Sequence, residues 1–322
     1  MSLADAESRN ENGEAPTENP KARRVRAGIA TVVTIGGRMV GLRKAFAASA
    51  AVAILVGWQE CALAQNLDGA HARSFVPQTD IVVTTSLAAF VGATEIWKAE
   101  LASEGCRWCT RNVIDERVRD ALHVGKSRKS VDEISGVTAF GVLPAFTIGG
   151  LLLAANTQGY RQHGSENILM LGQATIFGTA VSELAKFLAA RERPLVRNAS
   201  SEYELDPAER NLSFFSGHST IAFALASSMG TIANMRDYKA EPLFWSVGMG
   251  LAALVGYMRI AADKHYFTDV LVGALVGTAS GILVPQLLHP AVDPPGKTPE
   301  GAPVGPNLGS PATFSATYGG SF

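Results

Sequence analysis

Residues 259–288 have the sequence RIAADKHYFTDVLVGALVGTASGILVPQLL, in which a short polar segment leads into a long apolar run. Its larger part, Phe267–Leu288, is an apolar run of helical length with little strand-like alternation. Three residues that carry chemistry, Arg259, His265 and Asp269, lie before this run and in its first turn. The stretch therefore predicts a buried or membrane-spanning helix with a polar site at its N-terminal mouth.

Five further apolar segments of helical length precede this helix, so the sequence predicts an all-α bundle of about six core helices. The segments 135–156 and 243–262, like Phe267–Leu288, are apolar enough to span a membrane. The segments 80–97, 167–186 and 217–234 carry more polar residues and also suit the buried helices of a soluble bundle. Membrane embedding is thus one of two interpretations of the bundle.

The composition agrees with a helical protein in or near a membrane. Of the 322 residues, 47% are hydrophobic and only 18% are charged. The net charge of −1 provides no basic field for nucleic acid, so we expect no nucleic-acid partner. The sequence does not indicate an oligomeric state.

The composition changes along the chain and predicts five regions. Residues 1–38 are polar and predict a disordered extension. Residues 39–64 have a basic start, an apolar middle and an Ala-Leu-Ala end, which predicts a signal peptide; an uncleaved membrane helix is the alternative. Residues 65–134 form an N-terminal helical region and 135–290 the core. The Pro/Gly-rich tail, 291–322, ends in a weak strand-like alternation.

Two cysteines outside the predicted signal peptide, Cys106 and Cys109, form the motif Cys-Arg-Trp-Cys. In an oxidising compartment this pair is a disulfide candidate. A redox-active pair and half of a zinc site are the alternatives. We favour the structural disulfide because no thioredoxin-like strands surround the motif and no second pair of zinc ligands is evident.

Lys186 and Arg193 lie in the sequence KFLAARERP, seven residues apart, and would share one face of a continuous helix. Because Pro194 disfavours helical geometry at the residue before it, we expect the helix to end at Arg193. Lys and Arg together suit a phosphate group. The alternative is an ordinary solvated helix end, where cations complement the helix dipole.

A second cluster, Ser216, Gly217 and His218, precedes another apolar run. Ser216 is a candidate N-cap, and Gly217 allows backbone N–H groups to approach a ligand. His218 would then lie beside a bound anion with a proton that titrates near neutral pH. A serine cap with an incidental histidine is the alternative.

In the third cluster, His265 and Asp269 are four residues apart and would face each other on a helix. The carboxylate could accept from one imidazole nitrogen and leave the other as a nucleophile. Arg259 precedes them on a loop or helix end. A surface His–Asp pair is the alternative, but a strongly apolar helix follows directly.

Together the three clusters resemble the signature of the type 2 phosphatidic acid phosphatase and vanadium haloperoxidase superfamily: Lys-x6-Arg-Pro, Pro-Ser-Gly-His and Ser-Arg-x5-His-x3-Asp. The first part matches fully. In the second part Phe215 replaces the usual Pro, and in the third Met258 replaces the usual Ser. The resemblance covers residues 135–288. Neither departure removes a charged or nucleophilic group.

The resemblance implies one phosphate pocket at the end of the bundle, with no metal ion and no cofactor. His265 would attack phosphorus, Asp269 would orient it, and His218 would protonate the leaving oxygen and then activate water. The phosphate-binding residues would be Lys186, Arg193, Ser216, Gly217 and Arg259.

The implied function is a phosphatase that acts on a phosphomonoester or pyrophosphate, of a lipid such as phosphatidic acid or a polyprenyl pyrophosphate. The alternatives are a soluble periplasmic acid phosphatase for small phosphate esters, a vanadium-dependent haloperoxidase, and a non-catalytic envelope protein. The expected location is the inner membrane of a bacterial cell envelope, with the site facing the periplasm. The basic loop 98–133 opposes this orientation, because cationic loops favour the cytoplasmic side.

Overall fold

The computed structural model describes residues 73–197 and 206–291. These residues belong to one of the chain's two compact units, Gln65–Phe322. The predicted extension, the signal peptide and nearly all of the C-terminal tail, with its weak alternation, lie outside the described residues.

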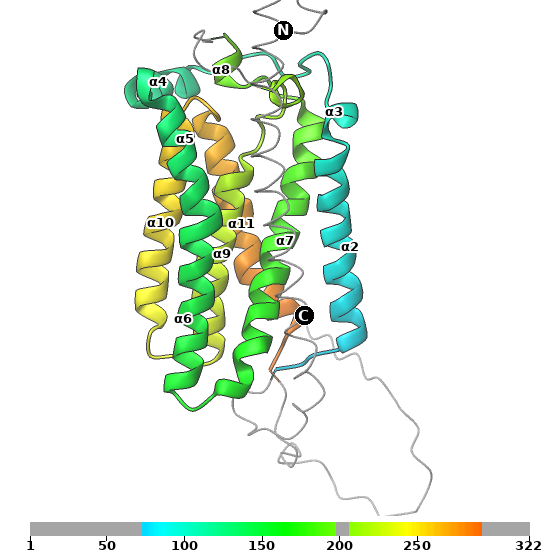
Figure 1. Ribbon diagram of the computed structural model, residues 1–322, viewed down its shortest axis with the longest axis vertical. Helices are drawn as coiled ribbons and strands as arrows, with labels where there is room; N and C mark the ends of the chain where they lie inside the picture. Colours follow the sequence, from blue (N-terminus) through cyan, green and yellow to red (C-terminus); the bar gives the residue numbers. More distant parts are fainter. Residues whose placement is uncertain (1–72, 198–205, 292–322) are drawn as a thin grey trace, which may run out of the picture. The chain divides into compact units, whose positions relative to one another are not determined.

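Long helices running side by side form the described structure, and the prediction of an all-α bundle is confirmed (Figure 1). In the described ranges the only β-pairings are two isolated bridges. A π-helical turn, η3 (Thr138–Val142), joins α5 to α6 without a break. The long elements are α2 (Pro77–Ile96), α5 (Arg128–Val137) with α6 (Leu143–Thr157), α7 (Gly164–Ala189), α9 (Gly217–Met235), α10 (Glu241–Ala261) and α11 (Phe267–Leu288).

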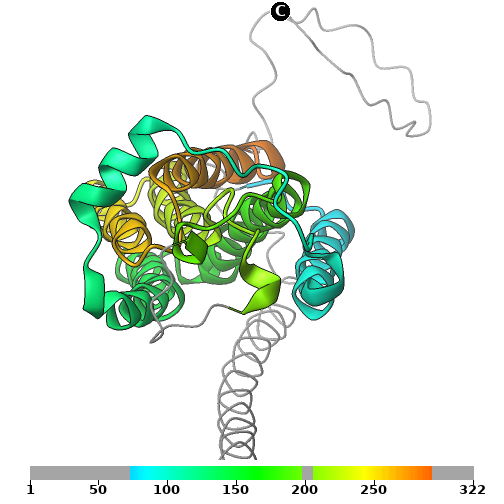
Figure 2. The same ribbon diagram turned by 90° about the horizontal axis from the view of Figure 1, so that it is seen from above.

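Short elements connect the long helices. Most of them lie at the end of the bundle where α7 and α10 finish, and Figure 2 looks onto this end. They are α3 (Lys98–Leu101), α4 (Val113–Leu122), η2 (Gly125–Ser127), α8 (Pro194–Arg197) and η5 (Pro207–Glu209), while η4 (Arg161–His163) joins α6 to α7 at the other end.

Helix α9 is the centre of the bundle and contacts α6, α7, α10 and α11. Its side chains Ala224, Ala226, Met229 and Ile232 have no exposed surface. Burial on every side requires small residues, and the many Ala, Ser and Gly residues of α9 meet this requirement. Because α9 is held from all sides, the residues at its N-terminus have a fixed position.

Helix α11 approaches α9 closely because glycines face it. A Cβ atom at Gly277 would lie 2.4 Å from the carbonyl oxygen of Thr220 and 3.1 Å from the backbone nitrogen of Ala224. Backbone atoms cannot move aside as a side chain can, so only glycine fits there. The contact fixes the start of α11 relative to the start of α9.

Within residues 73–197 and 206–291, five helices are long and apolar enough to cross a membrane, judged by length and composition. They include α2 and α7, whose segments the sequence left open, whereas the central α9 is not among them. Large apolar side chains on the outside agree, since Leu153, Leu275 and Leu287 are 63%, 63% and 74% exposed. These features indicate membrane association rather than a soluble bundle.

The described chain begins and ends at the same end of the bundle. The backbone N–H of Ser74 donates to the carbonyl of Pro290 at 3.0 Å, and Arg73 pairs with Ala291. The loops that carry the three sequence clusters lie at the opposite end (Figure 1). We call this opposite end the site end.

The α9–α11 contact can be tested with a pair of glycine substitutions. Gly277→Ala places a methyl group against backbone, so we expect a loss of about 1–3 kcal/mol of stability, measured by thermal unfolding in detergent. A methyl group on Gly250, in α10, would have no atom within 4 Å, so Gly250→Ala should be neutral or stabilising by about 0.5–1 kcal/mol. Equal effects of the two substitutions would contradict the close packing.

Candidate active site

The first cluster lies on a helix end that differs from the sequence prediction. Helix α7 ends at Ala189, not at Arg193, because Ala190 turns the chain with a left-handed φ of 43°. Pro194 instead begins the short helix α8. Lys186 therefore stays in the last turn of α7, while Arg193 lies on the loop beyond it.

Lys186 reaches the N-terminus of α9. A Cβ atom on Gly217 would lie 2.9 Å from the Lys186 Nζ, so the ammonium group occupies the space that a side chain there would need. Nζ also donates to Glu183 Oε1 at 2.5 Å. Glycine at 217 thus allows the cation to lie directly against the helix start.

Ser216 is the N-cap of α9, as predicted, and its Oγ accepts from the backbone N–H of Ser219 at 3.4 Å. The N–H of Ser216 itself donates to the carbonyl of Asp269 at 3.1 Å. The N–H groups of Gly217 and His218 belong to the first helical turn, where no intrahelical acceptor exists. These donors, next to the Lys186 ammonium, suit an anion.

Two arginines complete the cationic group. Arg259 lies in the last turn of α10 and donates to Asp132 and, at 2.9 Å, to Ser135 Oγ. Arg193 pairs with Glu209 at 3.7 Å. Both side chains are buried, and within the described residues the Nε atom of each has no hydrogen-bond acceptor. Each arginine therefore keeps a donor for an incoming oxygen.

His265 lies in the turn before α11, and its Nδ1 is 2.7 Å from the carbonyl oxygen of Ser213. A carbonyl can only accept, so Nδ1 carries the proton and a neutral ring has its lone pair on Nε2. Asp269 Oδ2 is 3.9 Å from Nδ1, beyond hydrogen-bond distance. The expected direct bond between the two is absent, because Oδ2 accepts from Ser213 Oγ and the Tyr266 N–H at 2.6 and 3.0 Å.

The charges of the site change its acid–base behaviour. Burial lowers the pKa of His265 well below 6.5, and Arg193, Arg259, Lys186 and His218 lower it further. Burial alone would raise the pKa of Glu209, but the cations around it, Arg193 first, bring it to about 2. Near neutral pH, His265 is thus a neutral imidazole among cations.

His218 projects from the first turn of α9, a helix outside the five candidate spans. The Phe140 ring, from the π-helical turn η3, meets it edge-on at 4.8 Å between centroids. Burial lowers the pKa of His218 well below 6.5, and the nearby Arg259 lowers it further. A bound phosphate would oppose the effect of the cations and favour protonation of this ring.

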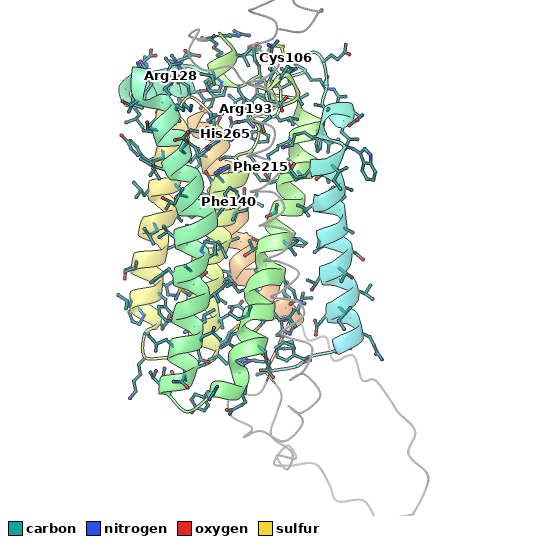
Figure 3. All side chains as sticks on the ribbon, viewed as in Figure 1. Cys106, Arg128, Phe140, Arg193, Phe215 and His265 are labelled. Atoms are coloured by element: carbon teal, nitrogen blue, oxygen red, sulfur yellow. A yellow bond between two sulfur atoms is a disulfide. The ribbon has the colours of Figure 1, made fainter. Side chains whose placement is uncertain are left out.

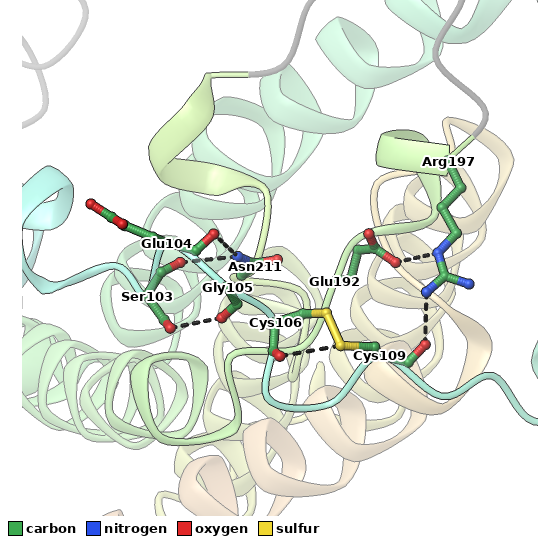
Figure 4. The surroundings of a disulfide bond; sticks show 8 residues. All are labelled: Ser103, Glu104, Gly105, Cys106, Cys109, Glu192, Arg197 and Asn211. Atoms are coloured by element: carbon green, nitrogen blue, oxygen red, sulfur yellow. Dashed lines mark hydrogen bonds and ion pairs between the residues drawn. A yellow bond between two sulfur atoms is a disulfide. The ribbon is translucent and has the colours of Figure 1, made fainter.

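The disulfide candidates are joined in the structure: Cys106 and Cys109 form a disulfide with their Cα atoms 5.6 Å apart. Figure 4 shows this loop beside the segment that follows α7. Arg197 Nη2 donates to the carbonyl of Cys109 at 2.9 Å, and Asn211 Nδ2 donates to that of Ser103 at 2.9 Å. The disulfide loop is therefore part of the site end.

All eight predicted catalytic and phosphate-binding residues lie at the site end, where Figure 3 labels Arg193 and His265. They come from the end of α7, the start of α9, the end of α10, the start of α11 and the loops between them. No group of three or more His, Cys, Asp or Glu residues that could hold a metal occurs in the described residues.

The local sequence patterns did not predict the partners of these groups. The carboxylates of Glu183, Glu209 and Asp132 pair with the three cations, and Ser213 holds the nucleophile candidate. The spacing of Glu183, three residues before Lys186, could have revealed its pairing. Asp132 is 127 residues from Arg259 in sequence, and no local pattern connects them.

Comparison with known proteins agrees with the three clusters. Residues 167–293 match the PAP2 superfamily, a region that contains every cluster residue. This part of the chain belongs to the PAP2 superfamily.

Two curated relatives are similar to part of the chain. Phospholipid phosphatase 2 of Mus musculus is 31% identical over 32% of this chain and 47% of its own length. Undecaprenyl-diphosphatase of Sulfolobus acidocaldarius is 28% identical over 35% of this chain and 50% of its own. The chain thus spans about half the length of the curated relatives it matches. A PAP2-type phosphatidylglycerolphosphate phosphatase structure from Bacillus subtilis has a TM-score of 0.40 at 18% identity, over 64% of this chain and 93% of that one.

The lowered pKa of His265 predicts a pH dependence of stability. Below pH 6.5 the unfolded chain binds a proton at this residue that the folded protein does not, so stability should fall by as much as about 1.4 kcal/mol per pH unit. His265→Gln should reduce this slope, measured by chemical unfolding between pH 7 and 5. His123→Gln, at an exposed histidine, is the control. An unchanged slope in His265→Gln would contradict a lowered pKa of His265 in the folded protein.

Proposed function

We propose that this protein is a phosphatase that hydrolyses a phosphomonoester or pyrophosphate of a lipid through a phosphohistidine on His265. The observation that carries the proposal is the His265 ring itself. Its Nδ1–H donates to the Ser213 carbonyl, which leaves the lone pair on Nε2, and the charges of Arg193, Arg259 and Lys186 lower the pKa of the ring. A fixed neutral imidazole among cations suits attack on a phosphate group.

In the first step, Arg193, Arg259, Lys186 and the Gly217 N–H bind the phosphoryl oxygens. The free Nε donors of the two arginines support this role. His265 Nε2 attacks phosphorus, a P–N bond forms and the bond to the leaving oxygen breaks. The cations stabilise the charge on the equatorial oxygens during this transfer.

His218 acts in both steps. It donates its proton to the leaving oxygen in the first step, once the bound phosphate has offset the surrounding cations. In the second step it accepts a proton from water, which attacks phosphorus and breaks the P–N bond. Phosphate leaves, and His265 returns to its neutral form.

A lipid substrate follows from the surroundings of the pocket. The site lies at the end of helices long and apolar enough to cross a membrane, so the phosphate of a membrane lipid can lie at the level of the site. The names of the two relatives, a phospholipid phosphatase and an undecaprenyl-diphosphatase, support the same substrate class.

We propose that the site end faces the oxidising side of the membrane, which in a bacterium is the periplasm. The Cys106–Cys109 disulfide lies at this end and supports the orientation.

If α2 crosses the membrane, this orientation requires the N-terminus of α2 to lie on the cytoplasmic side. If segment 39–64 instead carried the chain across the membrane, as a cleaved signal peptide or as a membrane helix, the N-terminus of α2 would lie outside. The site end would then lie on the cytoplasmic side. If α2 crosses the membrane, the predicted signal peptide and the predicted periplasmic site therefore exclude each other.

The source of charge stabilisation can be tested with a chelator. Because Lys186, Arg193 and Arg259 supply the positive charge, we expect turnover of a short-chain lipid phosphate to be unchanged in EDTA. Vanadate, which adopts the five-coordinate geometry of the transition state, should inhibit. Loss of activity in EDTA and its recovery with a divalent ion would contradict the mechanism.

The two histidine roles can be separated by substitution. His265→Ala should abolish turnover, and His218→Ala should lower kcat by about 10²–10⁴. His163 is a matched control, since it is buried and paired with Glu166 at the opposite end of the bundle. His163→Ala should leave kcat of the folded protein near the wild-type value. Near-normal turnover in His265→Ala would overturn the assignment of the nucleophile.

A further inference from the structure

Arg191 is a buried cation close to the site that no step of the proposed reaction uses. Its side chain is 1% exposed, and the Cζ atom lies 4.3 Å from the ring centroids of both Trp108 and Tyr266. The guanidinium group is thus enclosed between two aromatic rings. These distances allow cation–π attraction to both rings, and lysine lacks the planar fork that donates to partners on two sides.

The edges of the guanidinium group join two buried carboxylates. Nη1 donates to Asp269 Oδ1 and, at 2.8 Å, to Thr268 Oγ1, while Nη2 donates to Asp115 Oδ2 at 2.6 Å. Asp115 and Asp269 both have no exposed side-chain surface. Both Nη atoms of Arg191 are thus engaged by neighbouring side chains, and only its Nε atom lacks a hydrogen-bond acceptor within the described residues.

A short chain of hydrogen bonds leads from Arg191 to the nucleophile candidate. Asp269, held by Arg191 through Oδ1, accepts from Ser213 Oγ through Oδ2 at 2.6 Å. The carbonyl of Ser213 accepts from His265 Nδ1 at 2.7 Å. The backbone of Arg191 contributes as well, since its carbonyl accepts from the Ser213 N–H at 3.0 Å. Arg191 therefore fixes Ser213 from two sides.

The disulfide loop holds the other side of Arg191. Trp108 lies between Cys106 and Cys109, so the bridge closes the turn that presents its indole to the guanidinium group. Backbone bonds connect this loop to the segment after α7: the Arg107 N–H donates to Ala190 O at 3.0 Å. The indole also packs against the Phe214 ring at 5.1 Å, next to Ser213.

We propose that Arg191 is a positioning residue for the reaction, acting through Asp269 and Ser213 to hold His265 with its proton on Nδ1. Trp108, carried by the disulfide loop, keeps Arg191 in place. The inference rests on the proposed phosphatase function for its kinetic consequences but not for its effect on the His265 ring. Its test therefore includes a measurement that requires no turnover.

The kinetic test compares Arg191→Lys with Arg236→Lys. Arg236 is equally buried and pairs with Glu166 and Asn167, but at the opposite end of the bundle. Arg191→Lys should lower kcat about 10–100-fold with KM changed by less than about threefold, as for other groups that orient a reacting side chain. Arg236→Lys should leave kcat of the folded fraction unchanged. A rise in KM alone would instead assign Arg191 to phosphate binding and overturn the proposal.

A double substitution tests whether Arg191 acts through Asp269. In an Asp269→Asn background the charge that Arg191 holds is gone, so adding Arg191→Lys should lower kcat by less than about threefold more. If the two losses multiply, Arg191 acts independently of Asp269 and the proposed chain of contacts is wrong.

The structural test follows the imidazole nitrogens of His265 by NMR in ¹⁵N-histidine-labelled protein, with His265→Gln used to assign the signals. Wild type and Arg236→Lys should show the Nδ1–H tautomer, whereas Arg191→Lys should show a mixture of tautomers.

If Arg191→Lys does not fold, two substitutions of Trp108 replace it. Trp108→Leu should show the mixture of tautomers, and Trp108→Phe, which retains an aromatic ring, should show only the Nδ1–H tautomer. An unchanged Nδ1–H tautomer in Arg191→Lys, or in Trp108→Leu in its place, overturns the proposal. Lack of turnover in wild type would contradict only the phosphatase function.

Discussion

The hydrogen bond from His265 Nδ1 to the Ser213 carbonyl decides what the site can do, because it leaves the lone pair of a neutral imidazole on Nε2. The rest of the site end maintains this bond. The capped start of α11 holds Asp269, Asp269 holds the Ser213 hydroxyl, and Arg191 holds Asp269. The close contact of α9 with α11 keeps these loops together, and the disulfide loop encloses them from outside.

Much of the fold follows from the sequence. Apolar runs of helical length located the long helices of the described residues. Lys186 was expected at a helix end and Arg259 on a loop or helix end, and the structure has them in the last turns of α7 and α10. The end of α7 was misplaced because a left-handed alanine, Ala190, ends the helix without the glycine that usually marks such a turn. Nothing in a local sequence pattern predicts that conformation at an alanine.

The site was predictable where its chemistry lies within short motifs and unpredictable where it depends on contacts between distant segments. His265, His218 and the three cations lie in such motifs. The acceptor for His265 is a backbone carbonyl, which every residue has, so no residue type could indicate Ser213. The pairing of Arg259 with Asp132 and of Arg191 with Asp115 joins α10 and the segment after α7 to α5 and α4, which only the folded bundle brings together. These pairs balance cations at the site end, so the group is less positive than its motifs imply.

Identifying the phosphorylated residue would show directly whether His265 is the nucleophile. A short-chain lipid phosphate with a good leaving group, mixed with His218→Ala protein, should form a covalent intermediate that accumulates, because water activation is lost. Acid quenching would destroy a phosphohistidine, so the sample is denatured at high pH and its peptides are mapped by mass spectrometry. We expect one phosphorylated peptide, with phosphate on His265. Phosphate on another residue, or single-turnover hydrolysis with no phosphorylated protein at any time, would contradict it.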